Sequence, residues 1–205
     1  MLASRPPKTT AFIQLYLKEC SAHSDPCPMA QTWEPLSQIS KNLQEAVLIG
    51  EDDAFFEHEG IDPEAIRESM ELNLKKKKFA RGGSTITQQL VKNLYLSPSK
   101  NPLRKVKEIF IALFMEKILT KQRILELYLN VIEWGKGIYG AEAASQFYFH
   151  KPAKTLSTEE AAFLASIIPN PMFYTDPAHA QRASRRKGII LKRMSRRSFE
   201  ELKAE

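Results

Sequence analysis

No run of apolar residues in this sequence is long enough to cross a membrane. The longest uncharged stretch, residues 161–175, is interrupted by Pro169 and Pro171, whereas a spanning helix needs about 20 predominantly apolar residues. A signal peptide is also absent, because Met1 leads into Arg5-Pro6-Pro7-Lys8 rather than into an apolar core. We therefore expect either a cytosolic protein or a chain whose targeting segment is missing.

Cysteine is scarce and says little about the fold. The two cysteines, Cys20 and Cys27, stand close together near the N-terminus. Their spacing allows a disulfide in an oxidising compartment and equally allows two separate thiols. No Cys or His occurs at a metal-ligand spacing, and the Gly-x-x-x-x-Gly-Lys-Ser/Thr loop that binds nucleotide phosphates is missing.

The composition is that of one folded domain with a basic surface. A chain of 205 residues, 43% apolar and 26% charged, is long enough for one well-buried domain and short for two. Its 30 Lys and Arg outnumber 24 Asp and Glu, which gives a net charge of +6 and a pI near 9.2. This balance favours anionic partners: nucleic acid, phospholipid headgroups or a phosphorylated substrate.

Strand-like alternation is almost missing, whereas helix signals recur along the chain. Residues 161–165 are apolar on every side, which predicts a central buried helix that ends near Pro169. No internal repeat or low-complexity linker divides the chain, so we predict a single, mostly α domain. The expected helix starts are Ser40, Asp62 with Pro63, Thr85 with Gln88, Asn101 with Pro102, and Ser157 with Glu160.

Apolar stripes indicate which side of an expected helix faces the core. Residues 121–134 continue in helical style until Gly135, and the chain from Ala178 onward is helical and basic. Ile66, Met70 and Leu74 share one stripe in the segment after Pro63. Another stripe follows Pro102, and we expect it to face the core, with Glu108 pointing away from it. Its members are Val106, Ile109, Phe110 and Leu113.

The segment that begins at Glu51 gathers carboxylates and one histidine around two phenylalanines. Glu51 follows a glycine at the end of an apolar helix, so its side chain is expected at a helix terminus that faces a cleft. Burial against Phe55 and Phe56 would raise the pKa of Glu51 towards a useful general-base value. A solvated acidic turn, with His58 as a structural residue, is the alternative on composition alone.

A hydroxyl- and amide-rich loop opens the next helix. Gly82, Gly83, Ser84 and Thr85 offer backbone amides and hydroxyls at a helix N-terminus, where anions are favoured. The alternative is an ordinary glycine turn with Thr85 as the cap. The adjacent amides Gln88 and Gln89 weaken this alternative, because neither serves an apolar face.

Two basic motifs accompany these segments. Arg104 and Lys105 precede Glu108 by about one turn, an arrangement suited to a pyrophosphate, directly or through a divalent cation. The alternative is a surface ion pair worth about 0.3–0.5 kcal/mol. The run from Lys75 to Phe79 is either a solvated face or a contact with anionic lipid.

Five blocks in this order resemble glycosyltransferase family 51, the peptidoglycan glycosyltransferases, and within it the monofunctional enzymes. The likeness covers about residues 35–180. The first three blocks begin at Glu51, Gly82 and Arg104. The fourth contains residues 123–130 with Gly135, Gly140 and Lys151, and the fifth runs from Ala162 to Tyr174. The likeness implies residues 1–34 as an N-terminal segment and residues 35–205 as the catalytic domain.

The resemblance implies a lysozyme-like, two-lobed helical fold and a transferase of cell wall biogenesis. The implied reaction joins lipid-linked disaccharide-peptide units (lipid II) into peptidoglycan strands and releases undecaprenyl pyrophosphate. Glu51 would be the general base, and the reaction would invert the donor sugar at MurNAc C1. Glu108 would assist the leaving pyrophosphate, without an organic cofactor and with room for a divalent cation, Mg²⁺ or Mn²⁺.

The same resemblance implies further site residues. The mobile, membrane-touching part between the first two blocks would contain Leu74, Lys75, Lys76, Lys77, Lys78 and Phe79. The substrate would be bound by Arg81, Gly83, Ser84, Thr85, Gln88, Gln89, Lys92, Arg104, Lys105 and Asn130.

Such enzymes usually begin with a transmembrane anchor, which this chain does not contain. We therefore expect the periplasmic face of the bacterial inner membrane, with lipid II, the growing strand and the membrane surface as partners, and cell-wall synthases or divisome proteins besides. No nucleic-acid partner is expected. The competing hypotheses are a lysozyme-like lytic enzyme that cuts glycan and a non-catalytic, basic helical protein that binds nucleic acid.

Overall fold

The computed structural model describes residues 2–22, 27–76, 83–96 and 102–204 of the chain. The helices are α1 (Ala11–Ser21), α2 (Lys41–Glu51), α3 (Pro63–Lys76), α4 (Ile86–Tyr95), α5 (Pro102–Ile118), α6 (Lys121–Val131), α7 (Ala141–Phe149), α8 (Thr158–Ile167), α9 (Pro171–Tyr174) and α10 (Ala180–Ala204). Short 3₁₀ turns are η1 (Leu36–Gln38), η2 (Ala153–Thr155) and η3 (Pro177–His179). The strands are β1 (Ala30–Gln31), β2 (Glu133–Gly135) and β3 (Ile138–Tyr139).

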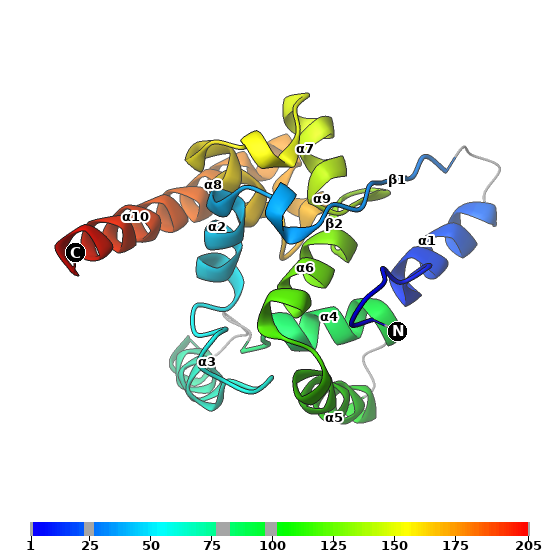
Figure 1. The fold of residues 1–205 in the computed structure, drawn as a ribbon, viewed down its shortest axis with the longest axis horizontal. Coiled ribbons are helices and arrows are strands. Elements are labelled where there is room, and N and C mark those ends of the chain that lie inside the picture. The colour runs from blue at the N-terminus through cyan, green and yellow to red at the C-terminus, as the bar shows by residue number, and fades with distance from the viewer. Residues whose placement is uncertain (1, 23–26, 77–82, 97–101, 205) are drawn as a thin grey trace.

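This order of elements confirms the mostly α, lysozyme-like architecture that the sequence predicts. In Figure 1, α7, α8 and α9 gather at the upper end with part of α2, while α3, α4 and α5 lie at the lower end. The long helix α10 packs on α2 and α8 and then extends away from the body of the molecule. No helix among the described residues is long and apolar enough to span a membrane.

Most of the predicted helix starts are confirmed by side-chain caps. Ser40 accepts the amide of Leu43 at the start of α2, and Asp62 accepts the amide of Ala65 in α3. The two predicted capping boxes are present, one at the start of α4 and one at the start of α8. These motifs are local, so the sequence alone specifies them.

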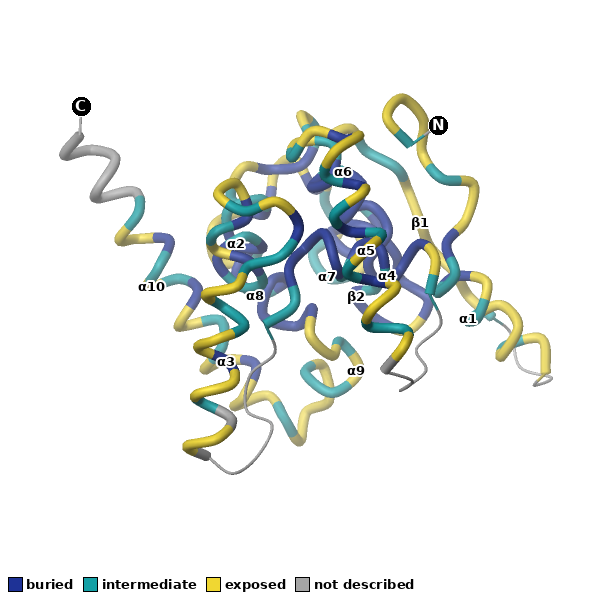
Figure 2. Tube along the Cα trace, turned by 90° about the horizontal axis from the view of Figure 1, so that it is seen from below, coloured by how far each residue is buried: buried dark blue, intermediate teal, exposed yellow. Residues whose placement is uncertain are grey.

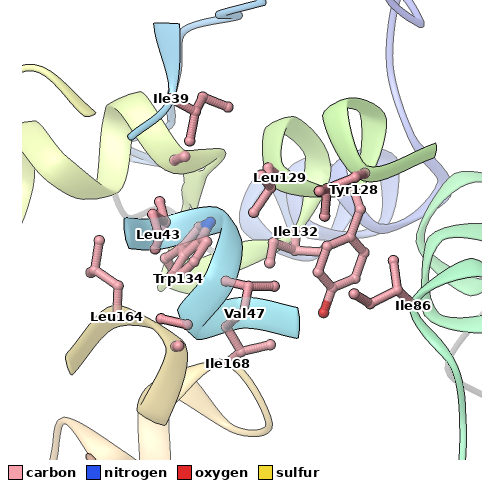
Figure 3. Close-up of a cluster of buried hydrophobic side chains, with 14 of the residues drawn as sticks. Ile39, Leu43, Val47, Ile86, Tyr128, Leu129, Ile132, Trp134, Leu164 and Ile168 are labelled. Atoms are coloured by element: carbon pink, nitrogen blue, oxygen red, sulfur yellow. The ribbon is translucent and has the colours of Figure 1, made fainter. Parts of the chain in front are cut away.

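The core lies where α2 meets α8 and where α4 meets α6. Helix α8 is buried on almost every side, as predicted for residues 161–165. In Figure 3, Val47 of α2 lies between Ile168 beyond α8 and Ile132 beyond α6. Figure 2 shows the same distribution, with buried residues on α2, α4, α6 and α8 and exposed residues along α3 and α9.

A small sheet interrupts the helical chain after α6. Strand β3 lies between β1, which is parallel to it, and the antiparallel β2. The prediction that the helix runs on to Trp134 is therefore wrong, because α6 ends at Val131. Strands of two or three residues are too short to leave an alternating pattern in the sequence.

The N-terminal part of the chain packs on this body. Helix α1 contacts α4, and β1 pairs with β3. Asn130, which is fully buried, holds the segment that follows β1: its Oδ1 accepts the amide of Glu34, and its Nδ2 donates to the Glu34 carbonyl. Cys20 and Cys27 are not joined by a disulfide in this structure.

Helix α5 is turned the other way from the prediction. Glu108 is 3% exposed, whereas Val106 is 48% and Phe110 67% exposed. The predicted inward stripe is therefore wrong for these two residues, and so is the outward direction of Glu108. The apolar row on the outer side of α5, called the α5 apolar face below, consists of Leu103, Val106, Phe110, Phe114 and Ile118.

Helix α3 also exposes its apolar residues. Met70 and Leu74 of the predicted stripe are more than half exposed, and α3 lies at the same end of the molecule as α5 (Figure 1). A period of 3.6 residues identifies which side chains share a face, but it does not say which face meets the core.

Two glycines provide a matched test of this fold. Gly140 has a φ of +85°, and a Cβ there would lie 2.8 Å from the carbonyl oxygen of Asn130. We expect Gly140→Ala to lower the free energy of unfolding by about 1–3 kcal/mol through backbone strain. Gly188 lies in α10, where an added Cβ would have nothing within 4 Å. Gly188→Ala should therefore raise the free energy of unfolding by about 0.5–1 kcal/mol. Urea unfolding of both variants measures this, and a Gly140→Ala protein as stable as the parent would contradict the role of Gly140.

Candidate functional site

Glu51 is the last residue of α2, and its side chain is buried between other helices. Only 8% of the side chain is exposed. Gln89 of α4 donates from Nε2 to Glu51 Oε2 at 2.9 Å. Arg186 of α10 donates from Nη2 to Glu51 Oε1 at 2.7 Å. Each carboxylate oxygen is thus held by a different helix.

Tyr128 of α6 fixes the orientation of Gln89. The Tyr128 hydroxyl donates to Gln89 Oε1 at 2.9 Å, so the amide NH₂ of Gln89 is turned towards Glu51. Tyr128 is fully buried, and burial together with the nearby negative charge of Glu51 raises its pKa well above the ordinary value. The phenol therefore stays protonated and remains a donor.

Two opposing effects act on the ionisation of Glu51. Burial is the larger effect and raises the pKa of the carboxyl group above 4.5. The positive charge of Arg186, the hydrogen bonds from Gln89 and Arg186, and the charge of Lys92 lower it. Glu51 is therefore a carboxylate with a raised pKa, as suits a general base, and one hydrogen-bond donor holds each of its oxygens.

A second carboxylate, Glu108, lies in a cluster of positive charge on α5. Arg104 donates from Nη1 to Glu108 Oε2 at 2.7 Å, and Lys105 pairs with Oε1. Lys105 Nζ also donates to Ser84 Oγ at 2.9 Å, which links α5 to the loop before α4. The i,i+4 pair of Arg104 and Glu108 that the alternative named is present, but Glu108 is buried rather than on the surface.

Lys92 of α4 connects the two carboxylates electrostatically. Burial lowers the pKa of Lys92, while the negative charges of Glu108 and Glu51 raise it. Its ammonium group therefore interacts electrostatically with both carboxylates, although they belong to different helices. Gln89 and Lys92, three residues apart on α4, place the Glu51 group and the Glu108 group along one side of that helix.

Asp52 and His58 hold the loop that follows Glu51. His58 Nε2 donates to Asp52 Oδ1 at 2.9 Å, and the Gly60 amide donates to His58 Nδ1 at 3.1 Å. Asp52 Oδ2 also accepts the amide of Ile86 at the start of α4. His58 is therefore the structural residue that composition favoured, and the pair joins the end of α2 to α4.

The two phenylalanines of this loop do not supply the contacts that hold Glu51. Phe55 is fully buried and packs edge-on against Phe56 and His58. Lys121 Nζ lies 4.5 Å from the centre of the Phe55 ring. The predicted burial of Glu51 is confirmed, but the hydrogen bonds that hold it come from α4 and α10.

Several predicted substrate-binding residues make contacts that hold the fold. Thr85 and Gln88 form the capping box of α4, and a Cβ at Gly83 would lie 3.0 Å from the Cα of Ile66, so glycine permits α3 to approach. The side chain of Asn130 forms hydrogen bonds with the backbone of Glu34 rather than with the residues around Glu51.

The predicted membrane-contact residues are only partly described. Leu74 and Lys75 are exposed on α3, and Lys76 is the last residue of that helix. Lys77, Lys78, Phe79 and Arg81 lie outside the described residues.

The sequence interpretation missed Arg186 as a site residue and gave Tyr128 no role. Arg186 is one of many arginines in a basic helix, 135 positions from Glu51 in the chain, so no local motif distinguishes it. Arg186, Arg193 and Arg197 do share one face by their spacing of seven and four. That periodicity was the available signal.

The described residues do not provide a ready-made metal site. They contain no cluster of three or more His, Cys, Asp or Glu side chains that could hold a metal ion. Mg²⁺ is commonly held by one or two carboxylates together with waters and substrate phosphates, and Glu108 is paired with Arg104 and Lys105 here. A divalent cation between Glu108 and a substrate pyrophosphate therefore stays a prediction.

An open cavity of about 540 Å³ lies elsewhere, between α2, α8 and α10. None of the predicted site residues lines it. Its lining residues include Asn42, Glu45, Glu159 and Lys192. The hydrogen-bonded groups around Glu51 and Glu108, rather than this cavity, are therefore the candidate site.

The raised pKa of Glu51 should affect how the free energy of unfolding depends on pH. A carboxyl whose pKa is higher in the folded than in the unfolded protein costs stability as the pH rises from about 4.5 through the folded-state value. We expect Glu51→Gln to remove this dependence, so that its stability relative to the parent improves across that interval. Urea unfolding of both proteins from pH 4 to 8 measures the difference. A difference that is constant with pH would contradict a raised pKa.

Comparison with known proteins adds independent information. A family model described as Transglycosylase matches residues 22–195. A biosynthetic peptidoglycan transglycosylase of Nitrosospira multiformis is 45% identical over 193 residues, which cover 94% of this chain and 84% of that protein. Proteins with the same name from Dechloromonas aromatica and Chromobacterium violaceum are 46% and 44% identical, cover 92% of this chain, and are themselves covered to 81% and 83%.

Proposed function

Because the chain belongs to the transglycosylase family, we propose that it polymerises lipid II into the glycan strands of peptidoglycan. The observation that carries this proposal is the pair of buried carboxylates, Glu51 and Glu108, which both act electrostatically on Lys92 and have different environments. One is suited to accept a proton and the other lies among cations. The relatives are named as biosynthetic enzymes, which favours strand synthesis over the lytic alternative.

Glu51 acts as the general base in the proposed reaction. It takes the proton of the 4-hydroxyl of the acceptor GlcNAc, and that oxygen attacks C1 of the donor MurNAc. The new C1–O4 bond forms as the bond from C1 to the pyrophosphate oxygen breaks, so the configuration at C1 inverts from α to β. Each carboxylate oxygen of Glu51 has one protein donor and keeps a lone pair for the acceptor hydroxyl.

The Glu108 cluster handles the leaving group. The bonding electrons leave with undecaprenyl pyrophosphate, so negative charge develops on the bridging oxygen and must be stabilised. Arg104, Lys105 and Lys92 provide positive charge there, and Glu108 holds the first two in place. An inverting transfer needs one base and a stabilised leaving group, and no covalent nucleophile.

Ser84 and Gln89 also line the donor side of the proposed substrate site. Ser84 lies beside Lys105, and Gln89 lies beside Glu51. Gly83, Thr85 and Gln88 support the loop that carries Ser84, and Asn130 supports the chain before α2 in the same way. Arg81 stays a predicted phosphate contact.

A lipid-linked substrate places the protein at a membrane surface, and the α5 apolar face supports this. Its residues are about half or more exposed to solvent, and exposed apolar rows of this kind commonly mark interaction sites. Exposed Lys107 and Lys117 on the same helix add positive charge that suits anionic headgroups. We propose that this face and exposed Leu74 of α3 contact the periplasmic leaflet of the inner membrane.

The proposed reaction is tested with purified protein and lipid-linked disaccharide-pentapeptide in detergent. The parent should form a polymer that muramidase digests, and Glu51→Gln should form it about 10²–10⁴-fold more slowly, because the general base is lost. Glu57→Gln is the matched control: it removes an exposed carboxylate of the same loop and should polymerise like the parent. Glycan hydrolysis without polymer would instead support the lytic alternative, and unchanged turnover in Glu51→Gln would end the assignment of the base.

Membrane contact is tested by flotation with anionic phospholipid vesicles. We expect the double change Phe110→Ser and Phe114→Ser to weaken vesicle binding at least about tenfold, since each buried aromatic ring contributes about 1.5–3 kcal/mol. Phe147→Ser is the control, because Phe147 is 59% exposed on α7, at the opposite end of the molecule (Figure 1). Equal losses in both variants would argue against a specific role for α5.

A further inference from the structure

Three arginines on one face of α10 lie against the C-terminal end of α2. Arg186 donates from Nη2 to the Gly50 carbonyl at 2.9 Å as well as to Glu51. Arg193 donates from Nη1 to the Ile49 carbonyl at 3.0 Å, and Arg197 pairs with Asp53. The last carbonyl groups of α2 carry partial negative charge, and α10 supplies the compensating cations.

Arg186 is the member of this row that reaches the candidate base. One nitrogen, Nη2, binds both a fixed backbone carbonyl and Glu51 Oε1. Its Nε is buried and has no hydrogen-bond partner among the described residues. The Gly50 carbonyl at the end of α2 therefore fixes the guanidinium of Arg186, and the guanidinium orients the carboxylate of Glu51 relative to that helix.

The absence of a side chain at Gly50 lets α10 approach α2 closely. A Cβ at Gly50 would lie 3.3 Å from Ile190 Cδ1, which is a tight contact, and 3.8 Å from Arg186 Nη2, which is an ordinary van der Waals distance. The close approach of α10 to α2 therefore occurs at the residue before Glu51.

On this geometry we propose that Arg186 is a positioning residue for the transfer reaction: it orients Glu51 and balances its charge from α10. The inference rests on the proposed function for its catalytic consequence, but not for the contact itself. Arg186 touches no reacting atom in this proposal and acts only through Glu51.

The charges around Glu51 decide what happens when Arg186 is removed. Besides Arg186, α4 contributes the cation Lys92, α6 contributes the neutral hydroxyl of Tyr128, and the chain after α2 contributes the negative charge of Asp52. Helix α8 faces the end of α2 with the backbone of Ala165. Arg186 is the strongest of the groups that lower the pKa of Glu51, so its removal leaves burial less opposed and moves that pKa upward.

The contact is tested first without enzyme activity. Titration of the Glu51 carboxyl by ¹³C NMR, with its signal identified by its loss in Glu51→Gln, gives the midpoint directly. We expect a higher midpoint in Arg186→Gln than in the parent. Arg185→Gln removes an exposed arginine one position away and should leave the midpoint unchanged. Equal midpoints in Arg186→Gln and the parent would overturn the proposal.

The catalytic consequence is tested by the pH dependence of polymerisation. We expect Arg186→Gln to lose about 10²-fold in kcat/KM near neutral pH, as misplacement of a catalytic group commonly does. The acidic limb of its profile should move to higher pH, so that raising the pH restores part of the activity. Full activity with an unmoved limb would overturn the proposal, and so would a uniform loss at every pH, which a merely structural role predicts.

Arg186→Lys separates orientation from charge and covers the case in which the glutamine variant does not fold. Lysine keeps the positive charge but not the planar donor geometry, so the acidic limb should stay near that of the parent while kcat falls severalfold. A lysine variant with parental kcat would overturn the positioning role. A parent that forms no polymer while the NMR midpoints still differ would reject the proposed function and leave the Arg186 contact intact.

Discussion

A carboxylate buried at the end of a helix needs compensation, and this requirement organises the centre of the molecule. Glu51 lies where the carbonyl groups of α2 already concentrate negative charge. Burial of an uncompensated ion there would be costly. Helix α4 provides an amide, α6 orients that amide, and α10 provides a guanidinium. Three helices thus contribute the groups that hold one charged side chain.

Helix α4 extends this arrangement to the second carboxylate. Its N-terminus is fixed by Asp52 and by the hydroxyl of Thr85, which donates to the carbonyl of Gly60. Its next turn carries Gln89 and Lys92, one beside Glu51 and the other in the field of both carboxylates. In the proposed mechanism, a displacement of α4 would therefore disturb proton transfer and leaving-group stabilisation together.

How much of this the sequence could predict depends on the range of the interactions. The caps at Ser40, Thr85 and Ser157 involve residues three positions apart, so they could be predicted correctly. The direction of α5 could not be predicted, because the 3.6-residue period places Phe110 and Glu108 on opposite sides of the helix without showing which side meets the core. The contact of Arg186 with Glu51 spans 135 positions and depends on tertiary packing. The family resemblance pointed to Glu51 and Glu108, but the contacts of Arg186 and Tyr128 emerged only from the fold.

The orientation of α5 has a geometric consequence for the proposed membrane contact. Glu108 is two positions from both Val106 and Phe110, so it lies on nearly the opposite side of the helix from the α5 apolar face. When that face rests on lipid, the Glu108 cluster stands above the surface by about one helix diameter, roughly 10–12 Å. In the proposed membrane contact, the helix sets the distance of Arg104 and Lys105 from the bilayer surface. A lipid-linked substrate that diffuses in two dimensions would then meet these cations at the level of its headgroup.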